Sequence, residues 1–559
     1  AGRGPLGGRP ATLLAALTLL LAAALVPAAL GLAAAPSVLE ALAPEPATIG
    51  RAALAELAAA ALVLLLPTAL MGALFSHVVG LCAGRGVGRA YALNTLGGAL
   101  APFAFGAWAI PRLGYADAFY LVAYAYLALY AGFCWIRRFP TAALLGGVLA
   151  VVGLTAIGPR ALNLITQEPG WSVVEQRETL YGVVTVAELA PPAAAPGAPA
   201  PPPLRRLQVD QNFRMGGALS FGEQRMGHLP LLLSPRRGRV LFLGAADARR
   251  ALAADRSTYD VVIGDLFHPG RDGAAALFAR EHFEAIRARL APGGLYAQWL
   301  PLHQLDDASL RAIVRTFLAV FPEADAYLGI FNARTPSLAL VGYMPREPGS
   351  APPLDLAALR ADLARPGLTV VDPRDLLASR LLDAAGLAAF AGDGPLNLDL
   401  APRVLFTAPR AAYAGELGRG ADALEALLAA RAPLPDRLLA GDPAELADLL
   451  ARYQRALDHY LRGEIALARR PDDRVDVADL APYLAAYDAD PAFPAARGLL
   501  YGAAARDPAV AAVALPRMLA RTPDEPRVYQ AYLQHLQRVG DRATFERVLA
   551  EAQARFGPP

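Results

Sequence analysis

The chain has 559 residues, 55% of them apolar, and its mean hydropathy is +0.34. Since this apolar fraction exceeds that of ordinary globular domains, we expect membrane-spanning segments in a chain with room for two to four domains. A net charge of +2 spread along the chain excludes a nucleic-acid-binding surface. The chain contains no lysine, which excludes a Walker A motif and a Schiff-base lysine. Its two cysteines are too few for a disulfide framework or a cysteine-rich zinc site.

Five apolar segments occupy the first 160 residues, and each approaches or exceeds the ~20 residues that a helix needs to cross a bilayer. They span residues 11–35, 52–83, 90–111, 118–136 and 141–157. We therefore predict about five transmembrane helices over residues 1–160. A signal peptide is the alternative for the first segment, because Arg3 and Arg9 precede it. The first residue is Ala1 rather than Met, which leaves the native N-terminus open.

Charged residues between these segments predict which side of the membrane each loop faces. Acidic loops contain Glu40, Glu45 and Asp117, whereas arginines gather in the other loops at Arg3/Arg9, Arg85/Arg89 and Arg137/Arg138. Positive loops face the cytoplasm, so five spans would leave everything after Arg160 outside, and one span more or fewer would reverse this. The deep parts of the segments lack charged residues apart from Glu56, which disfavours a transporter with an ion pathway.

Residues 171–236 alternate apolar and polar positions in the way that half-buried strands do. We predict strands at residues 173–175, 181–187 and 204–210, and a loop over the Pro/Ala-rich residues 190–203. This segment is predicted to form a small β-subdomain.

Residues 237–410 have the pattern of an α/β domain. Residues 239–244 predict a buried strand that ends in Gly244, residues 247–254 a short helix, and residues 259–265 a second buried strand that ends in Asp265. A nucleotide-binding sheet would continue the first strand into a glycine-rich turn, a helix and a second strand with a ribose-binding carboxylate. Here the first strand is followed only by Ala245, Ala246 and Asp247, so the cofactor-binding segment is missing.

The rest of this domain predicts a helix at 277–290 with Ile286 and Leu290 on its apolar face, a strand at 295–300, a helix at 307–320, and an antiparallel pair at 326–331 and 337–343. In the usual strand order of such folds, 3-2-1-4-5, loss of strands two and three leaves a contiguous sheet. Strand one would then become an exposed edge. From residue 411 onward the chain predicts helices, with a tetratricopeptide-like hairpin at 525–538 and 542–555 that offers a surface to a protein partner.

Several blocks, in a fixed order, carry a resemblance to a known family. They are YGVVTV, LQVDQNF, GEQRMGHLPLLL, YDVVIGDLFHP, LFAREHFEAIRARLAPGGLYAQWLPLHQLD and GPLNLDLAPRVLFTAPR, all after a membrane run that begins at Pro67. Over residues 67–410 the chain resembles the bacterial membrane-fused spermidine synthase-like proteins, in which transmembrane helices precede an aminopropyltransferase-type domain. The resemblance implies an α-helical bundle in the bacterial inner membrane, a truncated Rossmann-like, methyltransferase-type domain, and a possible polyamine ligand.

The resemblance also implies roles for single residues. Asp265 matches a general base that takes a proton from the attacking amine, and the alternative is that it caps the following loop or helix. For the cofactor the candidates are Gly244 and Asp247, the latter matching an aspartate near the adenine, and for the substrate they are Asp210, His228 and His268. The family's tyrosine and glutamate ahead of His228 are replaced by Gly222 and Gln224, and we expect His282 and His303 to be structural and no metal to bind.

These observations lead to one hypothesis and two alternatives. The leading hypothesis is a membrane-bound, spermidine synthase-like protein that has lost cofactor binding and acts in binding or assembly. The first alternative is an active aminopropyltransferase that uses decarboxylated S-adenosylmethionine, with the missing loop supplied by another chain or lost through a faulty gene model. The second is a transporter.

Overall fold

The computed structural model describes residues 9–44, 48–82, 86–137, 169–179, 182–190, 203–209, 213–215, 221–244, 248–270, 273–345, 354–365, 372–414, 416–431, 439–440 and 444–557, together with residues 145, 149, 152, 153 and 156. The chain divides into two compact units, Ala1–Ser220 and Phe221–Pro559. Each unit is described by itself.

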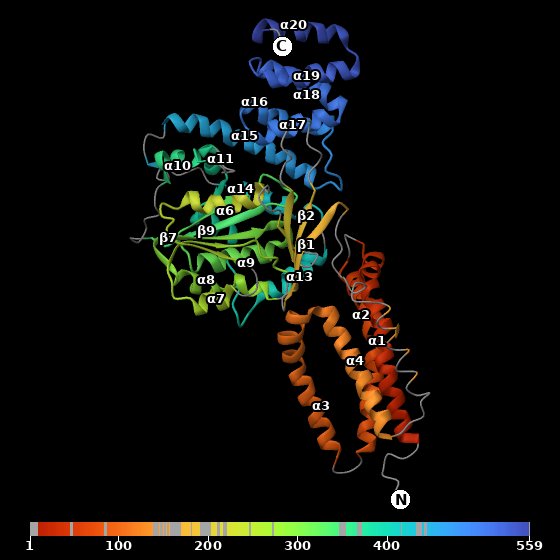
Figure 1. Cartoon of the computed structure of the whole chain (residues 1–559). Coiled ribbons are helices and arrows are strands. Elements are labelled where there is room, and N and C mark those ends of the chain that lie inside the picture. Colours follow the sequence, from red (N-terminus) through yellow and green to blue (C-terminus); the bar gives the residue numbers. More distant parts are fainter. Residues whose placement is uncertain are drawn as a thin grey trace, which may run out of the picture. The chain divides into compact units, whose positions relative to one another are not determined.

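Long apolar helices open the first unit, where α1 packs against α2 and α4 (Figure 1). The helices are α1 (Arg9–Leu42), α2 (Ile49–Leu81), α3 (Val87–Ala101), the π-helical η1 (Pro102–Ala109) and α4 (Ile110–Arg137). Three continuous helical stretches among the described residues are long and apolar enough to cross a membrane: Pro10–Leu42, Gly50–Leu81 and Val87–Arg137. The third stretch contains the third and fourth predicted segments, and the fifth, 141–157, falls mostly outside the described residues.

The third stretch is interrupted at Gly114, whose φ of +86° and ψ of 160° are not helical. An L side chain rarely adopts this conformation, and a Cβ at Gly114 would lie 3.1 Å from the carboxylate of Glu178. That carboxylate, from strand β1 (Trp171–Thr179), accepts the N–H of Tyr115 just after the break. The strand therefore contacts the chain at the point where the long helix breaks.

A four-stranded antiparallel sheet follows in the same unit, in the order β1-β2-β3-β4. The remaining strands are β2 (Gly182–Leu189), β3 (Leu204–Val209) and β4 (Phe213–Met215). The three predicted strands are confirmed, with β1 starting earlier and ending later than the pattern indicated. The buried positions of β2 alternate along the strand, as in a sheet with one covered face.

The second unit is built on a six-stranded sheet with the order β11-β8-β9-β7-β6-β5. Strands β5, β6 and β7 are parallel, whereas β9, β8 and β11 are antiparallel to their neighbours. The strands are β5 (Val240–Leu243), β6 (Tyr259–Gly264), β7 (Leu290–Pro301), β8 (Ala324–Leu328), β9 (Ser337–Tyr343) and β11 (Arg380–Leu382). The predicted first strand is β5, and it lies at the edge of the sheet, where Phe242 is 60% exposed.

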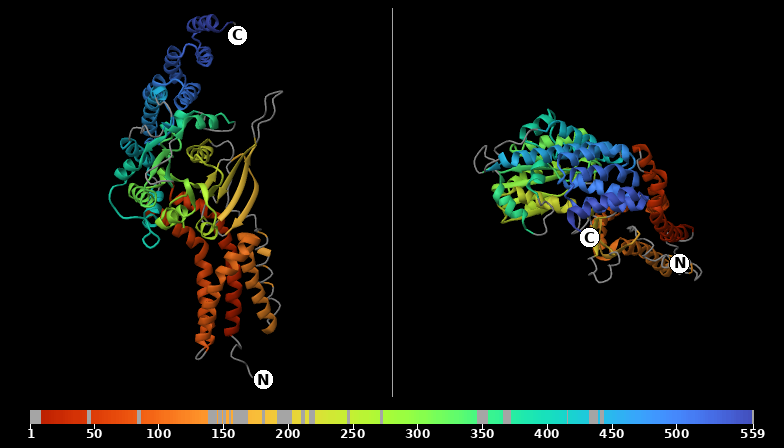
Figure 2. Two further views of the ribbon diagram at one scale, coloured as in Figure 1. Left: turned by 90° about the vertical axis from the view of Figure 1, so that its left-hand side faces the viewer. Right: turned by 90° about the horizontal axis from the view of Figure 1, so that it is seen from above.

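Helices cover both faces of this sheet (Figure 1, Figure 2). One face packs against α6 and the other against α8 and α9. The helices around the sheet are α6 (Phe221–Leu233), α7 (Ala248–Ala254), η3 (Ala274–Phe278), α8 (Arg280–Arg287), η4 (Leu302–Gln304), α9 (Asp307–Leu318), α10 (Leu356–Leu363), α11 (Pro373–Ala378), α12 (Ala384–Ala391), α13 (Arg403–Ala414) and α14 (Arg419–Ala429). A two-stranded parallel pair, β10 (Leu354–Asp355) and β12 (Leu439–Ala440), lies beside them.

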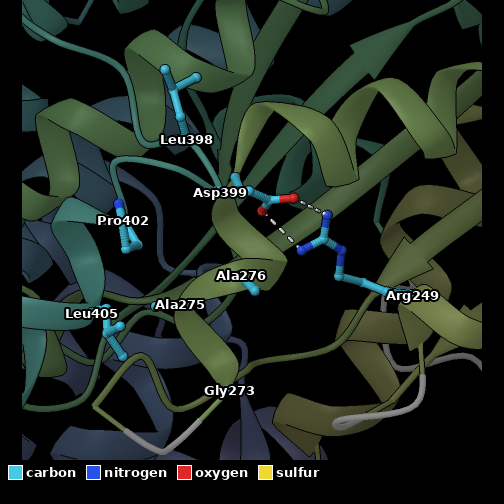
Figure 3. Close-up of a pocket in the computed structure, with 9 residues that line it drawn as sticks. Arg249, Gly273, Ala275, Ala276, Leu398, Asp399, Pro402 and Leu405 are labelled. Carbon is cyan, nitrogen blue, oxygen red and sulfur yellow. Dashed lines mark hydrogen bonds and ion pairs between the residues drawn. The ribbon is translucent and has the colours of Figure 1, made fainter.

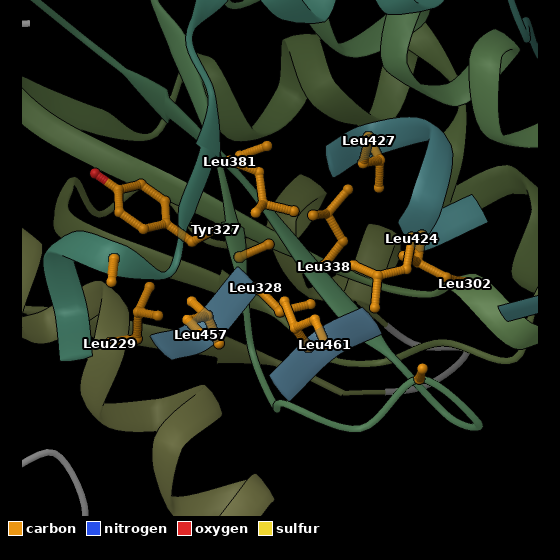
Figure 4. Packing of buried hydrophobic residues seen from close by; sticks show 14 of the residues in the cluster. Leu229, Leu302, Tyr327, Leu328, Leu338, Leu381, Leu424, Leu427, Leu457 and Leu461 are labelled. Atoms are coloured by element: carbon orange, nitrogen blue, oxygen red, sulfur yellow. The ribbon is translucent and has the colours of Figure 1, made fainter. Parts of the chain in front are cut away.

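The two faces have different cores. Tyr296 of β7 packs against an aromatic cluster of Phe283, Phe317 and Phe321 on α8 and its neighbours. On the opposite face the indole N–H of Trp299 donates to the carbonyl of Met226 in α6, at 3.1 Å. Buried leucines from strands and helices, such as Leu229, Leu338 and Leu457, pack together in the core around the sheet (Figure 4). Strands β8 and β9 and most of β7 are therefore buried on both faces, whereas β5 at the edge of the sheet leaves Phe242 exposed.

One predicted helix is wrong in its boundaries. The run 277–290 is split at Ala279, which has an extended backbone and separates η3 from α8. Ile286 is buried on α8 as expected, but Leu290 begins β7 and pairs with Tyr259. Leu290 is apolar and fits the helical spacing, so the pattern included it in the helix. In the structure it instead pairs with β6 as the first residue of β7.

The C-terminal part is helical. It contains α15 (Ala444–Ala468), η6 (Val477–Asp479), α16 (Leu480–Ala489), α17 (Pro494–Arg506), α18 (Pro508–Arg521), α19 (Pro526–Val539) and α20 (Arg542–Phe556). Each long helix packs against the next, and Gly540 ends α19 in a left-handed conformation with φ of +77°. The two helices of the predicted hairpin are present, while its tetratricopeptide character stays a prediction.

Candidate functional site

Asp265 lies at the carboxyl end of β6, where α/β folds build their sites. Its N–H donates to the carbonyl of Leu243 at the end of β5, at 3.0 Å, so the ends of the two strands lie side by side. Its side chain accepts the N–H of Leu266 at 2.7 Å. The carboxylate thus caps the loop that follows the strand, and the next helical turn, η3, begins after Gly273 instead.

A buried network positions the backbone of Asp265. The amide nitrogen of Gln298 donates to the carbonyl of Asp265 at 3.1 Å and to that of Trp299 at 2.9 Å. The hydroxyl of Tyr296 donates to the amide oxygen of the same Gln298. A Cβ at Gly264 would meet both side chains at less than 3.0 Å, which explains the glycine before Asp265. Polar groups so buried and mutually bonded hold a single geometry.

His268, in the loop after Asp265, and His303 both hydrogen-bond to the side chain of Gln304. The ring Nδ1 of His268 lies 2.8 Å from the amide oxygen of Gln304, and the ring Nε2 of His303 lies 3.2 Å from its amide nitrogen. The amide therefore accepts from His268 and donates to His303. This assigns the proton of His268 to Nδ1 and leaves Nε2 of His303 as an acceptor.

Burial changes the acidity of this cluster. It raises the pKa of Asp265, and the Leu266 N–H and the nearby His268 only partly oppose the change. A raised pKa makes the carboxylate a stronger base, which is the direction that general-base catalysis needs. Burial, together with the charge of His268, lowers the pKa of His303 to about 4, so His303 stays neutral at pH 7. His303 was expected to be structural, and it is a neutral partner in this network.

Two of the other predicted site residues, Gly244 and His268, lie near Asp265 in the described structure. Gly244 directly follows β5, next to Asp265. Asp247 and Asp210 lie outside the described residues. His228 is partly buried in α6, and burial lowers its pKa. His268 shares the Asp265 loop, so the structure brings together Gly244, Asp265 and His268.

A cavity of about 300 Å³ opens beside α7, η3 and α13 (Figure 3). The carboxylate of Asp399 and the guanidinium of Arg249 form two parallel hydrogen bonds of 2.8 and 2.6 Å at one side of it. Its walls are Arg249, Gly273, Ala275, Ala276, Ala279, Leu398, Asp399, Pro402 and Leu405. Apart from the ion pair, these walls are small or aliphatic, and the volume suits a small molecule.

His282 lies within electrostatic range of this ion pair. Its side chain is 1% exposed, and neither ring nitrogen has a hydrogen-bond partner among the described residues. Burial, with the charge of Arg249, lowers the pKa of His282 to about 3. Within the described chain, groups of three or more possible metal ligands are absent.

Comparisons with known proteins add to this picture. No protein-family model matches the chain. A stretch of 85 residues is 40% identical to polyamine aminopropyltransferase 2 of Pseudomonas aeruginosa and covers 15% of this chain and 24% of that protein. Part of the chain is thus similar to an aminopropyltransferase. The chain spans about a quarter of the length of this curated relative.

A solved structure, a crystal structure of spermidine synthase in complex with the transition-state analogue AdoDATO, also aligns with the chain. The alignment covers 39% of this chain and 94% of that chain, at 15% identity and a TM-score of 0.29. We draw no argument from so low a TM-score. The described strands form a mixed sheet that is consistent with a Rossmann-like fold.

Sequence reasoning missed the network around Asp265 and the polar wall of the cavity. Gln298 and Gln304 stand in a block that carries the family resemblance, so that block was the available signal. Arg249 and Asp399 are 150 residues apart, and the sequence contains no signal that joins them. Only the packing of α7 against the loop before α13 makes the pair.

Proposed function

We propose that this chain is a membrane-bound, spermidine synthase-like protein whose α/β domain binds a ligand or partner without using an adenosyl cofactor. The observation that carries this proposal is the edge position of β5. An adenosyl cofactor would need a glycine-rich turn after this strand and a carboxylate on the next strand outward. In the described sheet no strand lies beyond β5, and only residues 244–247 separate β5 from α7.

The first prediction concerns the loss of adenosyl-cofactor binding. We expect the full chain in detergent to give no binding heat with S-adenosylmethionine or its decarboxylated form at about millimolar concentration, because the groups that would hold the ribose and the sulfonium side of the cofactor are missing. Isothermal titration is the measurement, with an active aminopropyltransferase as the positive control. A dissociation constant below about 100 µM would contradict the proposal.

The contact between Glu178 and Tyr115 supports an outward-facing domain. It brings β1 to the Gly114 end of α4, whereas α4 finishes at Arg137. Six arginines of the sequence lie in or next to the helix ends on the Arg137 side, and two, Arg51 and Arg112, lie in the helix ends on the Gly114 side. Because arginine-rich loops stay in the cytoplasm, β1 would face outward, and residues 138–168 would have to cross the bilayer to reach it.

The second unit would lie on the same side, because residues 216–220 between β4 and α6 are too few to span a bilayer. A cytoplasmic nucleotide would then be out of reach. This proposal also assigns the C-terminal helices α15–α20 to contacts with a protein partner, since stacked helical pairs present such surfaces.

The second prediction concerns this orientation. Alkaline phosphatase fused after Pro559 should be active, because that enzyme folds only outside the cytoplasm, while green fluorescent protein at the same position should stay dark. Fusions after Arg137 are the matched control and should give the opposite pair of results. Fluorescence from the Pro559 fusion would overturn the outward orientation.

An active aminopropyltransferase is the second candidate function, favoured by the geometry of Asp265. Its carboxylate stands at a strand end with a raised pKa, beside His268, and the stretch similar to an aminopropyltransferase supports the same chemistry. The carboxylate would take a proton from the attacking amine of the substrate. The missing part of the sheet would then have to come from another chain.

The third prediction tests this candidate. If transfer is detected, Asp265→Asn should lower its rate by about 10²–10⁴-fold, the usual contribution of a general base, with little change in melting temperature. Asp448→Asn is a matched control, since it changes an exposed carboxylate on α15 that belongs to neither the Asp265 network nor the cavity. Unchanged activity with a lower melting temperature in Asp265→Asn would assign Asp265 to loop capping alone.

A further inference from the structure

The C-terminal helices are stacked at a regular spacing. The carbonyl of Asp488 in α16 accepts a hydrogen bond from Arg521 in α18, and the carbonyl of Ala505 in α17 accepts one from Arg538 in α19. In both contacts the two residues are 33 apart in the sequence. Alternate helices therefore lie side by side, and α17 and α19 belong to one layer of the array (Figure 1).

The exposed sides of α17 and α19 form one continuous surface. Arg527 of α19 lies over the ring of Tyr501 in α17, with its guanidinium carbon 4.9 Å from the ring centre. Farther along both helices, Arg538 donates to the carbonyl of Ala505 at 3.1 Å. We call this surface the α17–α19 face. Its exposed polar residues are Arg506, Arg527, Gln530, Gln534, Gln537 and Arg538.

The exposed positions of α19 lie along one side of the helix. Arg527, Gln530, Gln534 and Gln537 are spaced by three or four residues, the spacing at which helical side chains become neighbours. Each glutamine amide offers donors and an acceptor, which match the C=O and N–H groups of a peptide backbone. This row of amides therefore suits an extended main chain that lies alongside α19.

Next to this row, α17 presents little side-chain volume. Gly498 and Gly502 follow one another at a spacing of four residues, on the side of α17 that includes Ala505. A Cβ at either glycine would meet nothing within 4 Å beyond its chain neighbours and the backbone of its own helix. The long side chains of α19 thus stand beside a low strip over α17, where a peptide main chain can approach closely.

The charge of the α17–α19 face selects the kind of peptide. Neither helix contains an aspartate or glutamate, and within the described chain the three arginines of the face form no salt bridge. The carboxylates at the helix ends each have another arginine as partner: Asp507 has Arg474, Asp524 has Arg555, and Glu525 has Arg497 at 3.9 Å. The structure describes every residue from 444 to 556, so no charged group of these helices is left out. The guanidinium groups of the face can therefore bind carboxylates of a partner.

Two other kinds of partner fit less well. Asp524 and Asp541 flank α19 at its two ends and would repel the long phosphate backbone of a nucleic acid. Between Arg527 and Arg538 the exposed residues of α19 are all polar, which disfavours a lipid bilayer. The helix rises about 16 Å between these two arginines, which is the length of about five residues of an extended chain. A short acidic segment would therefore reach both.

We propose that the α17–α19 face binds a short, extended and acidic segment of a partner protein, with its main chain along the glutamines and its carboxylates on Arg506, Arg527 and Arg538. The inference rests on the proposed role of the C-terminal helices and names the chemistry of their partner. It can fail separately, because the nucleotide titration tests the loss of the cofactor and the peptides below test only this face.

The test compares labelled peptides of eight residues by fluorescence polarisation with the full chain in detergent. The probes are (Glu-Ala)4, (Gln-Ala)4 and (Arg-Ala)4, with an oligothymidylate of the same charge as the acidic peptide. The acidic peptide should bind at least about tenfold more tightly than the other three probes, and salt should weaken its binding. Equal or tighter binding of any other probe, or no binding of the acidic peptide at about a millimolar, would overturn the proposal.

A pair of arginine variants locates the binding. Arg527→Gln combined with Arg538→Gln should weaken binding of (Glu-Ala)4 by at least about tenfold, because two charge-assisted contacts are lost. Arg542→Gln combined with Arg547→Gln removes the same charge from the exposed side of α20 and should change binding by less than about twofold. Equal weakening in both variants would show a general attraction to the chain and would overturn the proposed site.

A pair of leucine variants tests the low strip without changing any charge. Gly498→Leu places a side chain over α17 and should weaken binding of (Glu-Ala)4 by at least about tenfold. Ala512→Leu on the exposed side of α18 is the matched control and should leave binding unchanged. If the arginine variants do not fold, this pair still decides, and equal binding in both would overturn the proposal.

Discussion

Replacing Arg380 with methionine should lower the stability of the α/β domain by about 3–5 kcal/mol, the usual cost of leaving one member of a buried ion pair alone. Arg380 of β11 lies 2.6 Å from Asp325 of β8, and the side chains are 2% and 9% exposed. The hydroxyl of Tyr343 donates to the second carboxylate oxygen at 3.2 Å. Without the guanidinium, the buried carboxyl of Asp325 would keep only one hydroxyl as its partner.

The same pair should be dispensable when it is removed as a whole. Burial raises the pKa of Asp325 even though Arg380 opposes the change, so the attraction does not recover the cost of taking the carboxylate out of water. The triple variant Asp325→Leu, Arg380→Met, Tyr343→Phe should therefore be as stable as the wild type or more stable, by up to about 4 kcal/mol.

Hydrogen exchange of peptides from β8 and β9 in the full chain measures the stability of the single variant and of the triple variant at the strands that carry the pair. The exposed pair Arg280–Glu284 on α8 is the matched control, and Arg280→Met should cost no more than about 0.5 kcal/mol. A single Arg380→Met variant as stable as this control would show that water or another residue already satisfies Asp325.

The sheet could be predicted largely from local patterns. Strands β5 and β6 are short apolar runs that end at Gly244 and Asp265, and such runs predict buried strands. This is confirmed over most of β6, whereas β5 exposes Phe242. The short connection from β5 to α7 then predicted that β5 lies at the edge of the sheet, as the described strand order has it. Pattern and topology were enough for these elements.

The candidate sites depended on contacts that no local pattern contains. The positions of Tyr296 and Gln298 follow from the alternation along β7, but their bonds to each other and to Asp265 require the side chains to be packed. The pair of Arg249 and Asp399 joins segments 150 residues apart. Sequence periodicity reports which face of an element is buried, and it does not report which residue lies opposite.

A partly buried glutamate makes the C-terminal helices sensitive to pH. Glu464 of α15 accepts a hydrogen bond from the hydroxyl of Tyr483 in α16 at 3.2 Å. Burial raises the pKa of Glu464 to about 7, although Tyr483, Tyr460 and the charge of Arg334 partly oppose the change. In the unfolded chain the same carboxyl would titrate near pH 4.5. The folded state thus keeps a proton that the unfolded state releases, so stability falls as the pH rises from about 4.5 to about 7.

Replacing Glu464 with glutamine should remove this loss. Glutamine is never charged and can still accept from Tyr483, so we expect the variant to match the wild type at pH 4 and to exceed it by about 3 kcal/mol at pH 8. Thermal unfolding of the full chain in detergent, followed by pulsed hydrogen exchange of the α15 and α16 peptides, gives the comparison. Glu546→Gln, at an exposed ion pair on α20, is the control and should change the pH dependence little. If Glu464→Gln loses stability between pH 4 and pH 8 as the wild type does, another group causes the loss, and Glu464 is already hydrated in the folded chain.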